Sequence, residues 1–104
     1  NIKTVTGNFD ETLQIVTTKK YDFIFVDGNH RKEPTLRYFN QLIPCVHNNT
    51  VMVFDDIHWS KEMEETWEEI RKHSSVTLTV DLFFIGLVFF RKEQKEKEHF
   101  VVRF

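Results

Sequence analysis

Two apolar stretches of this chain each run directly into acidic residues. The first, YDFIFVD at positions 21–27, ends at Asp27. The second, TVMVF at positions 50–54, is followed by Asp55 and Asp56. If these stretches are neighbouring parallel strands, the three carboxylates lie together at the edge of the sheet where open α/β folds bind ligands. Close carboxylates repel one another unless they are protonated, hydrogen-bonded or bridged by a cation, and Mg²⁺ with its preference for oxygen ligands would provide such a bridge.

The same residues also have a purely structural interpretation. Asp is favoured at strand ends because its short side chain caps the turn or helix that follows, so Asp27 and Asp56 need no ligand to explain them. His30 and His58 flank the acids in sequence, and each is a base, a metal ligand or an ordinary surface histidine. Trp59 either forms the wall of a pocket or packs against the following helix. From the residues alone, a cation site and a structural role are about equally supported.

The segments around the acids alternate between strand and helix patterns. IKTVTG at 2–7 alternates as a short strand does. The segment 21–27 is aromatic, β-branched and apolar on both faces, which is typical of a central strand in a parallel sheet covered on both sides. Pro44 and the HNN sequence at 47–49 are predicted to end a helix, and 50–54 is the next buried strand. Strands that alternate with helices predict an α/β fold with right-handed crossovers.

Three helices are predicted between and after these strands. Asp10 is a candidate N-cap for the segment 9–20. Pro34 suits the first position of the second helix, where its missing N–H would have no partner. Ser60 is a candidate N-cap for 61–73, whose acidic start and basic end complement the helix dipole. The residues predicted to face the core are Leu13 with Val16 or Thr17 in the first helix, Leu36, Phe39, Leu42 and Ile43 in the second, and Met63, Trp67 and Ile70 in the third.

The last third of the chain follows a different pattern. Segments 76–82, 86–91 and 99–104 have strand character and only short connections, so at least one pair must be antiparallel. The charged sequence KEQKEKE at 92–98 is predicted to be a solvated loop. The whole chain is therefore predicted to form one α/β unit with a mostly parallel sheet and antiparallel terminal strands.

Length and composition narrow the class of protein. The 104 residues suffice for one domain, and 40% of them are hydrophobic. A net charge of −2 provides no basic surface, so we expect no nucleic-acid partner. No run reaches the roughly 18 apolar residues of a membrane span, so we expect no membrane partner. The single cysteine, Cys45, is expected to be a small core residue, and the lack of a second cysteine favours a reducing compartment such as the cytoplasm.

Four blocks carry a family resemblance through their order and spacing. They are VTGNFDETL (5–13), YDFIFVDGNH (21–30), LIPCVHNNTVMVFDDIHW (42–59) and DLFFIGLVFFR (81–91). Together they resemble class I S-adenosylmethionine-dependent methyltransferases, and in particular the metal-dependent O-methyltransferase-like branch. The blocks are similar to the end of that family's third strand, its fourth strand and loop, its fifth strand and its closing segment. The resemblance implies the C-terminal portion of a Rossmann-like methyltransferase sheet.

The resemblance also implies a reaction and the residues for it. The cofactor would be S-adenosylmethionine, and the substrate a small-molecule methyl acceptor with a hydroxyl group. Asp27, Asp55 and Asp56 occupy the metal-ligand positions, where Mg²⁺ would make the acceptor hydroxyl easier to deprotonate. The implied catalytic residues are His30 and Asp27, with His30 as the base in a position where that branch often has Lys. The residues implied to border the cofactor are Asp27, Gly28 and Asn29 at its methionine end, and Asn8 and Phe9 near its adenine.

The first half of that family's domain has no counterpart in this sequence. It carries a Gly-rich loop, whereas the glycines here are only at positions 7, 28 and 86. We therefore expect residues 1–104 to be a partial domain, from the third strand to the C-terminus, and to be inactive alone. Because the family's first strand lies beside its fourth, we expect the segment 21–27 to be an unpaired apolar edge. Such an edge predicts self-association.

Two other functions fit part of the pattern. Receiver domains place an acidic pair and a third Asp around Mg²⁺, and YDFIFVD resembles their acceptor strand. Their acidic pair comes first in the sequence, however, whereas here Asp55 and Asp56 come second. The other alternative is a non-catalytic α/β interaction module in which the acids only cap turns.

Overall fold

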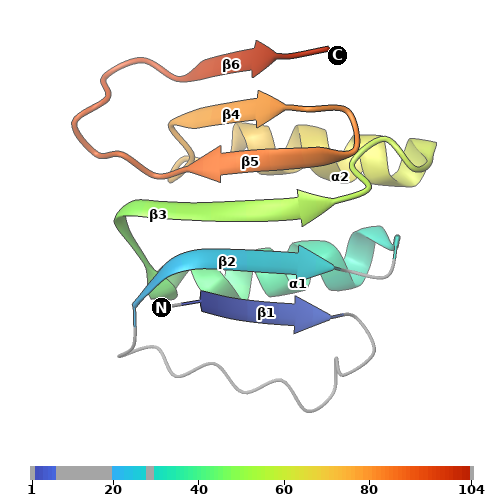
Figure 1. Ribbon diagram of the computed structural model, residues 1–104, viewed down its shortest axis with the longest axis horizontal. Helices are drawn as coiled ribbons and strands as arrows, with labels where there is room; N and C mark the ends of the chain where they lie inside the picture. Colours follow the sequence, from blue (N-terminus) through green and yellow to red (C-terminus); the bar gives the residue numbers. More distant parts are fainter. Residues whose placement is uncertain (1, 7–19, 28–29, 104) are drawn as a thin grey trace.

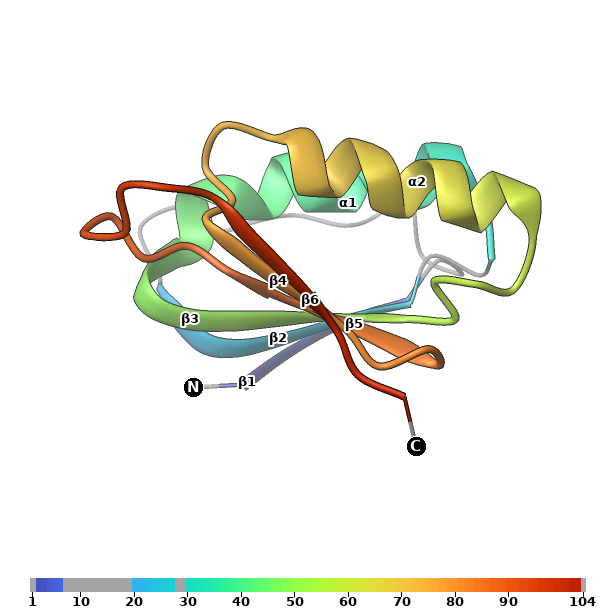
Figure 2. The ribbon, with the colours of Figure 1, turned by 90° about the horizontal axis from the view of Figure 1, so that it is seen from above.

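In the computed structural model, the described residues form a six-stranded sheet with two helices on one of its faces (Figure 1, Figure 2). The structure describes residues 2–6, 20–27 and 30–103. The strands are β1 (Ile2–Thr6), β2 (Tyr21–Asp27), β3 (Val46–Asp55), β4 (Leu78–Asp81), β5 (Ile85–Phe89) and β6 (Glu98–Val101). The helices are α1 (Lys32–Leu42), which continues into a 3₁₀ turn (Ile43–Cys45), and α2 (Lys61–Lys72).

The strands are ordered β1-β2-β3-β5-β4-β6 across the sheet. β1, β2 and β3 are parallel neighbours, β5 runs antiparallel to both β3 and β4, and β6 runs parallel to β4. Every described strand except β5 therefore points the same way, and the carboxyl ends of β2, β3 and β4 lie at one edge of the sheet (Figure 1). This confirms the predicted α/β fold with a mostly parallel sheet and an antiparallel terminal strand.

The expectation that the segment 21–27 is an unpaired edge is wrong. β1 pairs with β2 along its length, from Ile2 beside Phe23 to Thr6 beside Asp27. The backbone groups on that side of β2 are thus satisfied by a strand of the same chain, and the edges of the sheet are β1 and β6. Self-association stays a prediction, but it needs a different surface.

Several element boundaries differ from those predicted. α1 begins at Lys32, so Pro34 occupies the third helical position, which is still in the first turn where N–H groups have no intrahelical partner. The HNN sequence at 47–49 lies inside β3. There the Thr50 hydroxyl accepts from the His47 N–H at 2.8 Å and donates to the Tyr21 carbonyl at 2.6 Å, which ties the start of β3 to β2. The predicted helix at 9–20, with its Asp10 cap, lies outside the described residues.

The hydrophobic core lies between the sheet and the two helices. The predicted stripe of α1 supplies buried Phe39 and Leu42, while Leu36 and Ile43 pack at its margin. In α2 the predicted residues Met63, Trp67 and Ile70 are all buried, and Cys45 is buried as well. The predicted cap of α2 is confirmed, because the Ser60 hydroxyl accepts from the Met63 N–H at 3.1 Å. Among the described helices, none is both long and apolar enough to cross a membrane.

Gly86 lets α2 approach the sheet closely. A Cβ at this position would lie 2.5 Å from Trp67 Cη2 and 2.6 Å from Cζ3, and the indole is buried. We expect Gly86→Ala to lower the free energy of unfolding by about 1–3 kcal/mol, because a tightly packed ring must shift. Alanine is otherwise no less stable than glycine in a strand, so any loss of unfolding free energy is attributable to the clash with Trp67. Urea denaturation of the two proteins measures it.

A double-mutant cycle provides the control. Trp67→Leu opens the space that the new methyl group needs, so Gly86→Ala should cost much less in that background. An equal cost in both backgrounds would show that the contact with Trp67 is not the reason for glycine at this position.

Candidate active site

The carboxyl ends of β2 and β3 bring the three predicted acids together. Val26 and Phe54 are partners in the sheet, so the residues that follow them, Asp27 and Asp55, end the two strands side by side. Asp56 comes next and has a positive φ of 57°, which turns the chain sharply out of the sheet. Asp is among the residues that tolerate this conformation best.

The turn at Asp56 is fixed by backbone hydrogen bonds to two segments. Its N–H donates to the Phe84 carbonyl at 2.8 Å, and its carbonyl accepts from the Trp59 N–H at 3.0 Å. The loop between β4 and β5 therefore supports the acidic residues from the far side of the strands. This support determines where the Asp56 carboxylate points.

His30 is held against that carboxylate. Its Nε2 lies 2.6 Å from Asp56 Oδ2, and both side chains are about one-third exposed or less. The Trp59 ring stacks on the imidazole, with ring centroids 4.3 Å apart and planes inclined by 17°. His30 has a φ of 61° and lies two residues before the start of α1, where the Lys32 N–H donates to Glu62 of α2 at 2.7 Å. The contact with Asp56 thus fixes the imidazole within its plane, and the stacking of Trp59 holds one of its faces.

The electrostatics of the site centre on Asp55. Burial raises the pKa of the Asp55 carboxyl, and the negative charges of Asp56 and Asp27 raise it further. A hydrogen bond from the Asp56 backbone and the nearby His30 act in the opposite direction without cancelling the shift. The three carboxylates are therefore close enough to repel, and the site favours a proton or a cationic ligand.

The arrangement suits proton transfer. A histidine whose Nε2 donates to a carboxylate has a fixed tautomer with Nδ1 as the proton acceptor, which is the arrangement of a general base. Within the described residues, no group of three or more His, Cys, Asp or Glu side chains is arranged to hold a metal ion. Asp56 in addition already pairs with His30. The assignment of Asp27, Asp55 and Asp56 as Mg²⁺ ligands stays a prediction.

Four of the predicted site residues come together at this edge, namely Asp27, His30, Asp55 and Asp56. The other four, Asn8, Phe9, Gly28 and Asn29, lie outside the described residues. Trp59 forms a wall of the site, because it stacks on His30 and leaves 64% of its surface exposed.

His58 has a different role from His30. Its Nε2 lies 2.6 Å from Asp81 Oδ2 and its Nδ1 lies 2.8 Å from Glu64 Oε2. Burial alone would lower the pKa of His58, but these two partners outweigh it and raise the pKa. Burial would likewise raise the pKa of Asp81, whereas His58 and the Phe83 N–H hold it below its usual value. This network fixes the loop whose Phe84 carbonyl binds the Asp56 backbone.

Sequence reasoning did not identify Asp81 as part of the site's support. The signal was nevertheless present, since Asp81 ends a strand just as Asp27 and Asp55 do. Its carboxylate is only 5% exposed and accepts from the Phe83 N–H at 2.8 Å.

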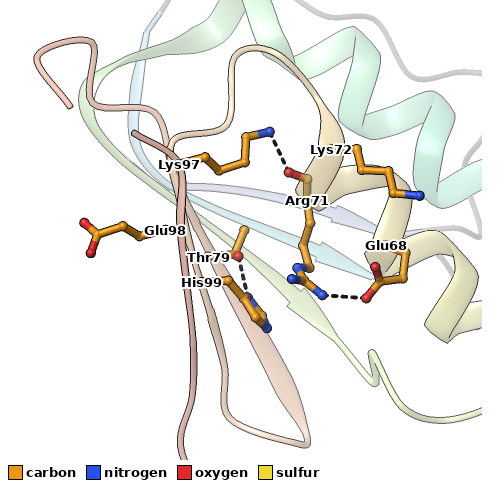
Figure 3. Close-up of a pocket in the computed structure, with 7 residues that line it drawn as sticks. All are labelled: Glu68, Arg71, Lys72, Thr79, Lys97, Glu98 and His99. Carbon is orange, nitrogen blue, oxygen red and sulfur yellow. Dashed lines mark hydrogen bonds and ion pairs between the residues drawn. The ribbon is translucent and has the colours of Figure 1, made fainter. Parts of the chain in front are cut away.

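A cavity of about 450 Å³ lies elsewhere, between α2 and the β4–β6 edge (Figure 3). Several of its charged and polar groups bind one another. Arg71 Nη1 donates to Glu68 Oε1 at 2.5 Å, Lys97 Nζ donates to the Arg71 carbonyl at 2.7 Å, and the Thr79 hydroxyl lies 2.7 Å from His99 Nδ1. The three acids of the candidate site and His30 do not line this cavity. It is therefore separate from that site.

The raised pKa of Asp55 predicts a pH-dependent effect on stability. Because the pKa is higher in the folded state, protonated Asp55 stabilises the fold at low pH, and this contribution is lost as the pH rises through the folded pKa. Asp55→Asn should therefore raise the melting temperature at neutral pH, and the gain should vanish below about pH 4, where Asp is protonated in the unfolded chain as well. Thermal unfolding across this pH range measures it.

Asp81→Asn is the control of opposite sign. The pKa of Asp81 is lowered in the fold, so its removal should destabilise the protein at neutral pH and progressively less in acid. A lower melting temperature for Asp55→Asn at neutral pH would contradict the proposed repulsion among the carboxylates.

Comparison with known proteins adds independent evidence. A family model described as "Methyltransferase domain" matches residues 1–57, which include Asp27, His30, Asp55 and Asp56. Comparisons with curated proteins and with solved structures give no significant match. The matched segment spans more than half of the chain and runs through β3 to the end of the acidic cluster. This chain therefore belongs to the methyltransferase domain family.

Proposed function

We propose that this chain provides the catalytic edge of an S-adenosylmethionine-dependent methyltransferase that acts on a hydroxyl oxygen of a small acceptor. The observation that supports this best is the His30–Asp56 pair, with its 2.6 Å contact at the carboxyl edge of the sheet. Membership of the methyltransferase family supports the reaction class. The choice of oxygen rests on the base, since a neutral hydroxyl must lose its proton during the transfer whereas many other acceptors need not.

In the proposed reaction His30 receives the acceptor's proton. Its Nε2–H donates to Asp56 Oδ2, which leaves Nδ1 as the basic nitrogen. When bound, S-adenosylmethionine would supply the methyl group to the acceptor oxygen and leave as the corresponding thioether. As the hydroxyl proton moves to Nδ1, Asp56 stabilises the imidazolium. Trp59, stacked on the ring, holds the plane of the imidazole in place.

The charge of the site supports a cationic ligand. Repulsion among Asp27, Asp55 and Asp56 is relieved by a positive group, and S-adenosylmethionine carries a sulfonium and an ammonium. In the proposal Asp27 borders the methionine end of the cofactor together with Gly28 and Asn29, and Asn8 and Phe9 lie near the adenine. No step of the proposed reaction depends on Mg²⁺, and its binding by Asp27, Asp55 and Asp56 stays a separate prediction.

Calorimetric titration of S-adenosylmethionine tests the cofactor. We expect binding to a longer protein that carries this sequence and none to residues 1–104 alone, because this chain has no Gly-rich loop to hold the carboxypropyl and ribose groups. The affinity should be the same with and without Mg²⁺. Tighter binding with Mg²⁺ would restore the three carboxylates as metal ligands. No binding to either protein would favour the non-catalytic interaction module.

His30→Gln tests the proposed base. The substitution is made in whichever protein binds the cofactor, residues 1–104 or the longer one. We expect the rate of methyl transfer to fall about 100-fold or more, because general-base catalysis contributes that much, with cofactor affinity unchanged. His47→Gln is a matched control, since His47 also pairs with an Asp, at 2.7 Å from Asp22 Oδ1, but at the opposite end of β2. Equal rates for the parent and His30→Gln would show that His30 is not the base.

A further inference from the structure

The turn that joins β4 to β5 lies at the same edge of the sheet as the candidate site (Figure 1). It consists of Leu82, Phe83 and Phe84, and we call it the support turn. Its Phe84 carbonyl accepts from the Asp56 N–H at 2.8 Å. The φ of 57° at Asp56 is uncommon for a residue with a side chain, and such a conformation persists only where contacts hold it. The support turn therefore helps to determine where the Asp56 carboxylate meets His30.

The support turn is itself strained. Phe83 at its centre has a φ of 73°, and the Phe84 N–H donates to the Leu82 carbonyl at 2.9 Å. A hydrogen bond across three residues, with a positive φ at the middle one, is the rarer and more strained form of the γ-turn. A bulky aromatic residue in this conformation is an outlier. Strain of this kind persists where neighbouring groups impose it, and it is frequent beside reactive sites.

Asp81 is the group that imposes this conformation. Its Oδ1 accepts from the Phe83 N–H at 2.8 Å, and its Oδ2 lies 2.6 Å from His58 Nε2. Its backbone is fixed at the end of β4, between Gly86 of β5 and Val101 of β6. Because the carboxylate is only 5% exposed, little water competes with it for the Phe83 N–H. A rigidly placed acceptor thus holds the centre of the support turn.

The ring of Phe83 is held as well. The His58 imidazole stacks on it, with ring centroids 5.5 Å apart and planes inclined by 23°, and the Arg103 guanidinium lies 5.3 Å from its centroid. Arg103 Nη1 also lies 3.4 Å from Asp81 Oδ1. His58 is tied in turn to Glu64 in the first turn of α2. Contacts from α2, from β4 and from the residues after β6 therefore converge on the support turn.

We propose that Asp81 is a positioning residue for His30 and acts through the support turn. Asp81 holds Phe83 in its strained conformation, and the turn then presents the Phe84 carbonyl to the Asp56 N–H. Asp56, fixed in this way, holds the imidazole of His30 at 2.6 Å. The inference rests on the proposed function only for the role of His30 as the base, because the contacts themselves do not depend on that role.

NMR spectroscopy of residues 1–104 tests this series of contacts through the ring protons of His30. In the parent protein they should be shifted upfield, because the Trp59 ring stacks on the imidazole. Asp81→Ala removes the acceptor of the Phe83 N–H, so the support turn should relax and release Asp56. Asp56 holds His30 through its carboxylate and Trp59 through its carbonyl, so the upfield shift should be lost.

Asp81→Asn is the matched control. Its amide oxygen still accepts from the Phe83 N–H, although the substitution removes the charge beside His58. The His30 shift should therefore be retained in this less stable variant, and the ring protons of His47, at the opposite end of the sheet, should be unchanged in both. Retention of the His30 shift in folded Asp81→Ala would overturn the proposal. Its loss in Asp81→Asn would also overturn it, because the cause would then be stability and not the hydrogen bond.

Phe83→Pro provides a second test if Asp81→Ala does not fold. Proline has no N–H and a φ of about −65°, so it cannot form the support turn. The Phe83 side chain is 45% exposed and lies outside the core cluster, so the fold should tolerate the change. The upfield shift of His30 should again be lost, and its retention would overturn the proposal.

A kinetic measurement separates this inference from the proposed function. In the protein that binds the cofactor, Asp81→Ala should lower kcat about tenfold or more at an unchanged KM for the cofactor, because the base is no longer held in place. Asp81→Asn should keep most of the parent kcat. A His30 shift that depends on Asp81, combined with equal methyl transfer by the parent and His30→Gln, would support the positioning contacts and refute the base.

Discussion

The parallel pairing of β2 with β3 is the constraint on which the rest of the molecule depends. By setting Val26 beside Phe54, it ends both strands at the same level and brings the carboxylates of Asp27 and Asp55 together. A slip of one residue in this register would move either Ile24 or Met52 out of the core and separate the two acids. Burial of the core and assembly of the site are therefore consequences of the same pairing.

The acidic residues of the site destabilise the fold, and contacts around them partly offset this effect. Burial and repulsion by the neighbouring acids disfavour the ionised form of Asp55, while the Asp56 backbone and His30 partly offset them. The support is spread over distant segments, because Phe84 binds the Asp56 backbone and the His58–Asp81 contact holds the loop that carries Phe84. Concentrated charge at a rigid strand end is a common feature of reactive sites.

Local patterns in the sequence predicted the parts of the structure that local interactions determine. β2 has the predicted bounds, Ser60 caps α2, and the acids follow their strands as expected. The position of β1 was not predictable, since it depends on which distant segments pair. The His30–Asp56 contact requires positive φ values at both residues, which no periodicity reveals. The apolar character of β2 on both faces predicted two covered faces, but it did not indicate that the described helices share one.

The two tryptophans give the molecule a built-in pair of fluorophores. Trp67 is 2% exposed, and within the described structure its Nε1 has no hydrogen-bond partner, so it emits from an apolar, unrelaxed environment. Trp59 is largely in water and stacks on the imidazole of His30. Blue emission is therefore expected to report the packing of Trp67 in the core, and red emission the surroundings of Trp59 at the candidate site. One spectrum thus observes the core and the candidate site through different residues.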